Sequence, residues 1–210
     1  IGSASAPAVT TAEITNIQAT TVTGGGNVTA DNGAAVTARG VCWSTTPNPT
    51  VGGIGCNHTS DGSGTGAFTS SIPGLTPNTT YYVRAYATNS VGTSYGEPKT
   101  FKTSCNSVIA TITGNNTICH GDSTTLSANS STSYLWSNHS VEKSITVSPS
   151  TSTTYSVTIT NEYGCTASTS FPVTVHYGTH NVTSVTECEA YTWTSGTGLT
   201  YTESGTHIYY

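Results

Sequence analysis

Two short motifs in the sequence have the letters of chemical sites. Gly92-Thr93-Ser94-Tyr95-Gly96 matches G-x-S-x-G, the nucleophile elbow in which a serine attacks a carbonyl carbon. That site requires a strand-to-helix turn, whereas this motif lies in a predicted hairpin loop with no helical pattern after it. Gly62-Ser63-Gly64-Thr65-Gly66 would suit a phosphate cradle, but a cradle needs a following helix and Ala67-Phe68-Thr69 is predicted as strand. We interpret both motifs as turns and predict no catalytic residue.

Metal-binding side chains are scattered along the chain. His176 and His180 have i,i+4 spacing, which brings ligands together only on a helix, and residues 172–183 are predicted to be extended. The acidic residues form no D-x-D-x-D-G loop for calcium, and Glu187 and Glu189 are predicted on a solvated strand face. No glycosidase acid and base can be assigned either. We predict no metal and no cofactor. The remaining histidines are His58, His120, His139 and His207.

Six cysteines are the most specific chemical feature. No C-x-x-C occurs, so a zinc ribbon or a thioredoxin-like pair is disfavoured, and disulfides in an oxidising compartment are predicted. Six cysteines allow fifteen pairings in principle. The cysteines are Cys42, Cys56, Cys105, Cys119, Cys165 and Cys188.

The composition predicts an all-β, secreted protein. Charged residues make up only 7% of the chain, there is no Met, and Thr, Val, Ile and Tyr favour strands separated by Gly, Asn, Ser and Pro turns. A net charge of −5 with five basic residues excludes a nucleic-acid or anionic-lipid footprint. No apolar run is long enough for a membrane span. Because residue 1 is Ile, we expect it to follow a removed signal or to mark the edge of a larger chain.

Residues 8–104 have the alternating runs and regular turns of a sandwich. Asp31-Asn32-Gly33 signals a tight turn, and in residues 81–87 one face is apolar while the other carries Tyr82, Arg84 and Tyr86. The predicted strands are residues 28–30, 36–43, 67–72 and 81–87.

Residues 75–89, L-T-P-N-T-T-Y-Y-V-R-A-Y-A-T-N, resemble the E–F corner and F strand of a fibronectin type III module. Together with R-G-V-C-W-S (39–44), P-N-P (47–49) and D-G-S-G-T-G (61–66), they resemble the variant found in secreted proteins of Bacteroidota. The resemblance implies a sandwich over residues 9–105 after an extended segment, 1–8. It further implies that Tyr81 forms the tyrosine corner, that Trp43 is a core residue, and that Cys42 and Cys56 lie on neighbouring strands where a local bridge can form.

Residues 106–176 form a second predicted β unit. Its strand candidates are 109–112, 124–127, 134–136, 144–147, 154–160 and 167–175. T-I-C-H-G-D-S (117–123), S-Y-L-W-S (133–137) and N-E-Y-G-C (161–165) resemble the Ig-like or PKD-like repeats of the same bacterial proteins. The resemblance implies that Cys119 pairs with Cys165 and that Trp136 fills the core.

Residues 177–210 resemble the first half of another repeat, through C-E-A-Y-T-W (188–193), L-T-Y-T (199–202) and G-T-H (205–207). So few strands bury little core alone. We expect this partial β module to lean on its own neighbour, for which a Cys105–Cys188 bridge would fit, or to be completed by another subunit.

Glycosylation is a further hypothesis for this hydroxyl-rich, charge-poor chain. Asp122-Ser123-Thr124 resembles the O-glycosylation acceptor of Bacteroidota, with Ser123 as the candidate. Sequons N-x-S/T are frequent in such a composition and prove little alone. They occur at Asn27, Asn57, Asn78, Asn115, Asn129, Asn138 and Asn181.

The charge distribution leads to the functional hypothesis. Sheet edges are normally guarded by Lys, Pro or inward charges, but the three lysines all lie from Lys99 to Lys143, and the segments 1–9 and 176–210 have none. We predict a non-enzymatic structural subunit of an extracellular bacterial filament or surface fibre, made of tandem sandwiches joined head to tail by strand complementation. Its partners are then copies of itself.

Two alternatives stay open at this stage, because these module types serve several functions. The first is an adhesin stalk or carbohydrate-binding accessory of a larger secreted protein, with sugars stacking on Tyr82, Tyr86, Tyr191 and Trp193. The second is a non-catalytic part of a secreted enzyme.

Overall fold

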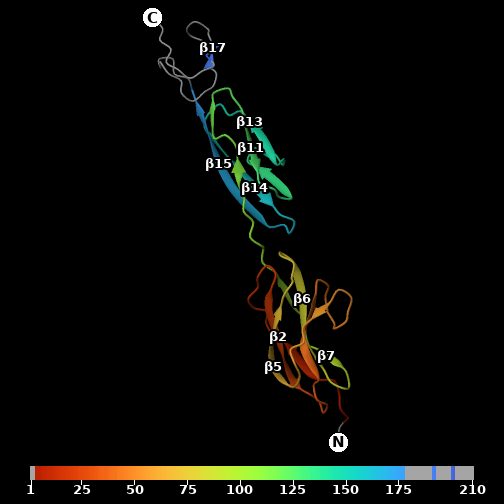
Figure 1. Cartoon of the computed structure of the whole chain (residues 1–210). Coiled ribbons are helices and arrows are strands. Elements are labelled where there is room, and N and C mark those ends of the chain that lie inside the picture. Colours follow the sequence, from red (N-terminus) through yellow and green to blue (C-terminus); the bar gives the residue numbers. More distant parts are fainter. Residues whose placement is uncertain (1–2, 178–190, 193–199, 202–210) are drawn as a thin grey trace. The chain divides into compact units, whose positions relative to one another are not determined.

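The computed structural model describes residues 3–177 together with the strand residues 191–192 and 200–201. The chain forms two compact units, residues 1–107 and 108–210, so the division falls two residues beyond the predicted boundary. Both units are all-β (Figure 1). Within the described ranges no helix is long and apolar enough to cross a membrane.

Unit 1 is a sandwich of two antiparallel sheets. One sheet has the strand order β1-β2-β5, and the other has the order β4-β3-β6-β7, with β8 pairing beside β7 on the same strand β6. The strands are β1 (Ala8–Thr11), β2 (Val22–Ala30), β3 (Ala38–Ser44), β4 (Asn57–His58), β5 (Gly66–Ile72), β6 (Thr80–Thr88), β7 (Thr93–Tyr95) and β8 (Lys99–Lys102).

The core of unit 1 lies between the inward faces of these two sheets. Val41, Ile72 and Val83 are fully buried, as the period-two alternation of their strands requires. Trp43 is 7% exposed and Tyr81 8% exposed. The Tyr81 hydroxyl accepts a hydrogen bond from the Thr76 backbone N–H at 3.0 Å, which is the bond of a tyrosine corner.

Unit 2 also consists of two sheets. A four-stranded sheet, β10-β15-β14-β12, faces a three-stranded sheet, β13-β11-β9, and β10 pairs with β15 in parallel. These strands are β9 (Ile112–Thr113), β10 (Thr117–Cys119), β11 (Thr124–Ala128), β12 (Ser133–Trp136), β13 (Ser144–Val147), β14 (Thr153–Thr160) and β15 (Thr166–His176). A short antiparallel pair, β16 (Tyr191–Thr192) with β17 (Thr200–Tyr201), follows them.

Trp136 is the centre of the core of unit 2. It is 1% exposed, and its indole Nε1 donates to the Glu142 carbonyl at 2.8 Å, so the one polar atom of a large buried side chain is satisfied. Leu126 of β11 and Val157 and Ile159 of β14 belong to the same buried cluster. The figure of the whole chain shows β14 and β15 as the long central strands of this unit (Figure 1).

Candidate functional site

The most concentrated polar cluster lies where the β4–β5 connection crosses β3. One carboxylate oxygen of Asp61, Oδ2, accepts from Thr59 Oγ1 at 2.6 Å and from Ser70 Oγ in a very short contact. The Thr59 carbonyl in turn accepts from the Tyr86 hydroxyl at 2.6 Å. A carboxylate beside a serine suggests an activated nucleophile, but Ser70 is fully buried and no substrate can reach it. The cluster fixes the connection to the sheet.

The glycine-rich turn before β5 presents carbonyls rather than amides. Arg39 Nη1 donates to the carbonyls of Gly64, Thr65 and Gly66 at 3.3, 3.0 and 3.4 Å, and its guanidinium lies 5.4 Å from the centre of the Phe68 ring. Three converging carbonyls attract a cation and repel a phosphate. This geometry therefore excludes the phosphate cradle and assigns the turn a structural role.

The three central residues of the G-x-S-x-G motif form a β-strand, and its two glycines flank that strand. Thr93–Tyr95 form β7, in which Ser94 pairs with Ala87 of β6, so the prediction of a loop throughout this segment is wrong. A Cβ built on Gly96 would lie 2.5 Å from the Thr11 backbone nitrogen, which explains that glycine by close packing. The strand-to-helix turn of a nucleophile elbow is absent at this place.

Cys42 and Cys56 are free thiols, so the predicted bridge between them is wrong. Cys42 is fully buried on β3, and its Sγ lies 3.4 Å from the Pro49 carbonyl and 3.6 Å from the Arg84 carbonyl. Burial raises the pKa of the Cys42 thiol to about 11, and the nearby Cys56 adds to the rise. Cys56 is half-buried, and β4 is only two residues long, so no ladder holds it against Cys42.

The other described cysteines, Cys105, Cys119 and Cys165, are disulfide-bonded. Cys119 pairs in the ladder with His176 at the end of β15, whereas Cys165 directly precedes the start of that strand. Eleven residues of strand span roughly 35 Å, and a disulfide requires Cα atoms within about 7 Å. The predicted Cys119–Cys165 pair is therefore wrong. Cys188, the predicted partner of Cys105, lies outside the described residues.

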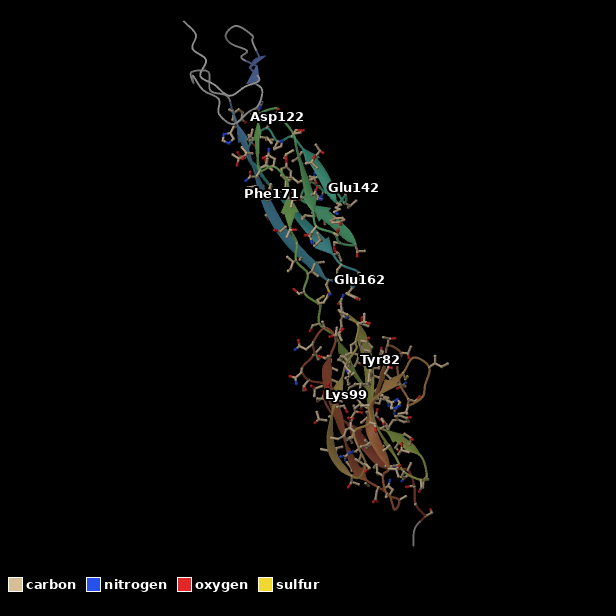
Figure 2. The ribbon with its side chains drawn as sticks, in the orientation of Figure 1. Tyr82, Lys99, Asp122, Glu142, Glu162 and Phe171 are labelled. Carbon is tan, nitrogen blue, oxygen red and sulfur yellow. The ribbon has the colours of Figure 1, made fainter. Side chains whose placement is uncertain are left out.

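The side-chain view makes the same separation visible. Asp122, three residues after Cys119, and Glu162, three residues before Cys165, mark opposite ends of unit 2 (Figure 2). The resemblance placed the two cysteines at one end because it supplied no register for β10. Only the parallel pairing of β10 with the end of β15 reveals the distance.

The sequon asparagines differ in how accessible they are. Asn129 is committed to the fold, because its side chain donates to the Ile109 carbonyl and accepts from the Thr111 N–H, both at 2.9 Å. Asn78 is half-buried in a turn. The exposed candidates are Asn27, Asn57, Asn115, Asn138 and Ser123, and Asn181 lies outside the described residues.

The aromatic side chains proposed for sugar stacking do not form a platform in unit 1. Tyr86 is 4% exposed and its hydroxyl is bonded inside the protein, so its assignment as an exposed aromatic is wrong. Tyr82 is half-buried. The side chain of Tyr191 and the whole of Trp193 lie outside the described residues.

Histidine and acidic side chains do not assemble into a metal centre in the described part of the chain, where no group of three potential ligands occurs. His58 contacts Tyr86 edge-on, with ring centres 6.1 Å apart, and His120 stacks on Tyr177 at 4.8 Å. These histidines pack as aromatic rings. His180, Glu187 and Glu189 lie outside the described residues.

The remaining surface feature is a set of sheet edges without charged residues. β5 ends the sheet β1-β2-β5, while β12 and β13 each end one sheet of unit 2. None of these three strands contains a charged residue. Leu135 on β12 is 53% exposed, with Val141 at 65% exposed in the following loop. The sequence analysis predicted uncharged, unprotected strands at the chain termini. It could not locate these edges, because strand order is not visible in a sequence.

No protein-family model and no functionally characterised protein sequence matches the chain. Among solved structures, the sensor domain of the anti-sigma factor RsgI4 from Pseudobacteroides cellulosolvens is similar over 50% of this chain and 100% of its own, with 19% identity and a TM-score of 0.37. A fibronectin type III domain of the human KIAA0970 protein matches over 48% and 77%, with 18% identity and a TM-score of 0.35. The FN1–FN3 domains of chicken CNTN1 match over 88% and 72%, with 13% identity and a TM-score of 0.37.

The fold itself is assigned from strand order. In unit 1 the sheet β1-β2-β5 faces the sheet built on β3 and β6, and in unit 2 the sheet β9-β11-β13 faces the sheet built on β14 and β15, as in immunoglobulin-type sandwiches. The chain is therefore an all-β protein of tandem fibronectin type III-like and Ig-like β-sandwiches.

Proposed function

We propose that this chain is a non-catalytic structural subunit of an extracellular filament or surface fibre, in which sandwiches are joined head to tail by strand complementation. The observation that carries the proposal is the set of open, uncharged edges on β5, β12 and β13. Exposed backbone groups on such edges pair readily with another strand, and soluble monomeric sandwiches normally prevent this with charge.

The chemistry of the described interior supports a structural role. The polar cluster at Asp61 and the carbonyls around Arg39 bind parts of unit 1 to each other, and the thiol of Cys42 is fully buried. Disulfides at Cys105, Cys119 and Cys165 suit an oxidising, extracellular setting.

The position of β1 modifies the proposal. Ala8–Thr11 pair with β2 in the same chain, so the end of the predicted N-terminal lead-in is already occupied. A strand donated to a neighbour therefore comes from the C-terminal segment 177–210.

The test is assembly of the purified 210-residue chain. We expect light scattering to detect growth beyond small oligomers as concentration rises, and negative-stain microscopy to show regular fibres. The same chain shortened after Tyr177 should stay unassembled. A folded monomer at high concentration, with residues 177–210 protected from proteolysis, contradicts head-to-tail completion.

A further inference from the structure

β5 is the most extensive open edge in the described part of the chain. It has seven residues, Gly-Ala-Phe-Thr-Ser-Ser-Ile, and pairs only with β2 (Figure 1). The open strands β12 and β13 have four residues each. No charge or proline interrupts β5, so none of the usual devices that keep an edge from pairing is present on this strand.

The ladder register shows which backbone groups of β5 are free. The Ala12 N–H donates to the Gly25 carbonyl at 3.0 Å, so the backbone N–H and C=O groups of Gly25 point toward the β1 side of β2. The backbone N–H and C=O groups of successive residues in a strand point to alternate edges of that strand. Those of the even-numbered residues of β2 therefore point toward β5. These pair with Gly66, Phe68, Ser70 and Ile72.

The intervening residues Ala67, Thr69 and Ser71 therefore direct their N–H and C=O groups away from β2. No backbone or side-chain group of the described residues bonds to these groups outside the β2–β5 ladder. Their side chains are small, uncharged and exposed. The edge thus offers three donors and three acceptors in a row. Two charged side chains contact β5, Arg39 at the Gly66 carbonyl and Asp61 at the Ser70 hydroxyl, but neither bonds to these six groups.

This row is self-complementary. We propose that β5 pairs antiparallel with β5 of a second copy of the chain, around a twofold axis at Thr69. Thr69 then faces Thr69 of the other copy as a hydrogen-bonded pair, and Ala67 faces Ser71 twice. All six free groups find partners, and the two three-stranded sheets become one sheet of six. No like charges meet across the contact, because β5 carries none.

A twofold contact closes after two copies. It joins chains side by side and leaves β12 and β13 as the open edges for the head-to-tail contact proposed above, which continues without limit. In a fibre, β5 pairing would bind two rows of head-to-tail subunits to each other.

The experiment uses the full chain and two substitutions at Thr69. Thr69→Lys places two like charges opposite each other at the axis. Thr69→Pro removes the outward N–H while leaving the ladder to β2 intact, since proline is tolerated where its nitrogen faces away from the sheet. The matched control is Thr125→Lys, because Thr125 is an exposed threonine on β11, a strand paired on both sides.

The readouts are sedimentation velocity over a concentration series and amide exchange by mass spectrometry of the peptide covering residues 66–72. We expect the wild type and Thr125→Lys to form a side-by-side pair in which the amides of Ala67, Thr69 and Ser71 become slow. Both Thr69 variants should weaken the pair by about tenfold or more and lose this protection, with circular dichroism unchanged.

The inference is overturned if the wild type leaves these three amides fast at every concentration, or if both Thr69 variants associate like the wild type. Open-ended growth that persists in the Thr69 variants, with the three amides fast in the wild type, supports the fibre and refutes the β5 contact. Saturation at two copies that the Thr69 variants abolish supports the β5 contact and refutes the head-to-tail fibre.

Discussion

Asn89 joins three segments of unit 1, and its replacement by aspartate is the most informative test of how this fold is held. The side chain is 5% exposed. Its Nδ2 donates to the carbonyls of Ser5 at 2.7 Å and Asp31 at 3.1 Å, and its Oδ1 accepts from the N–H groups of Val91 at 2.9 Å and Gly92 at 3.1 Å.

Asn89→Asp preserves the shape and the two accepted bonds but replaces the donor with an oxygen facing the carbonyls of Ser5 and Asp31. Two lost hydrogen bonds cost about 2 kcal/mol, and a buried oxygen or charge against carbonyls adds about 1–2 kcal/mol. We therefore expect unit 1 to lose about 3–4 kcal/mol of unfolding free energy, a shift of roughly 1–4 M in the urea midpoint.

The introduced carboxyl gives the test a pH signature. Burial and the facing carbonyls raise its folded-state pKa above the unfolded value of about 3.9. The deficit is therefore complete at neutral pH and shrinks as pH falls through the folded-state pKa, because the protonated acid donates one of the lost bonds. A deficit that stays constant from neutral pH down to the acid limit of the wild-type fold contradicts this account.

Asn32→Asp is the matched control, because Asn32 is exposed and its Nδ2 donates one bond, to the Ala6 carbonyl at 2.7 Å. Its loss should stay below about 1 kcal/mol. Equilibrium urea denaturation of the full chain, followed by circular dichroism and fluorescence, measures both variants. If Asn89→Asp costs less than about 0.5 kcal/mol, or no more than the control, Asn89 does not hold these segments together.

Two further outcomes follow from unit 1. Tyr81→Phe leaves the Thr76 N–H without its acceptor and should cost about 1–2 kcal/mol in the same urea assay, while Tyr82→Phe, half-buried on the other face, should cost less; equal losses would dismiss the tyrosine corner as a stabilising bond. The Cys42 thiol, with its pKa raised to about 11, should react with iodoacetamide far more slowly than Cys56 at pH 8. Since the unfolded thiol ionises first, near 9.0, the contribution of Cys42 to stability is complete below pH 9 and falls as pH rises toward 11. A difference in urea midpoint between the wild type and Cys42→Ser that stays constant from pH 8 to pH 10.5 would contradict this expectation.

Strand identity was predictable where side-chain alternation was strong. Residues 144–147 coincide with β13, and 67–72 lie within β5, because each alternates between core and solvent. β1, β7, β8 and β10 escaped prediction because they are three or four residues long and rich in Thr or Lys, with little alternation to read. Their pairing is set by the tertiary fold rather than by local pattern.

Disulfide pairing was not predictable for a physical reason. A bridge depends on Cα separations of a few ångströms, whereas sequence fixes only the order of the strands along the chain. Cys119 lies beside His176 because β10 crosses to pair with β15 in parallel, and nothing in the residues around Cys119 specifies that register. The predicted Cys42–Cys56 bridge is wrong for a different reason. The strand β4 after Cys56 pairs with β3 over only two residues, so Cys56 lies outside the ladder.

The shortage of basic residues explains why β5 has no guard. Both arginines are used inside unit 1: Arg39 donates to the carbonyls of the glycine-rich turn, and Arg84 Nε donates to the Gly96 carbonyl at 2.8 Å while its guanidinium lies 4.9 Å from the centre of the Tyr95 ring. Lys99 is paired with Glu13 on the surface. An edge is protected by a charged side chain that repels an incoming strand. An arginine that is bound to backbone carbonyls elsewhere in the same unit cannot protect the edge in this way. The composition that favours an uncharged, hydroxyl-rich surface therefore also leaves the edge open to another strand.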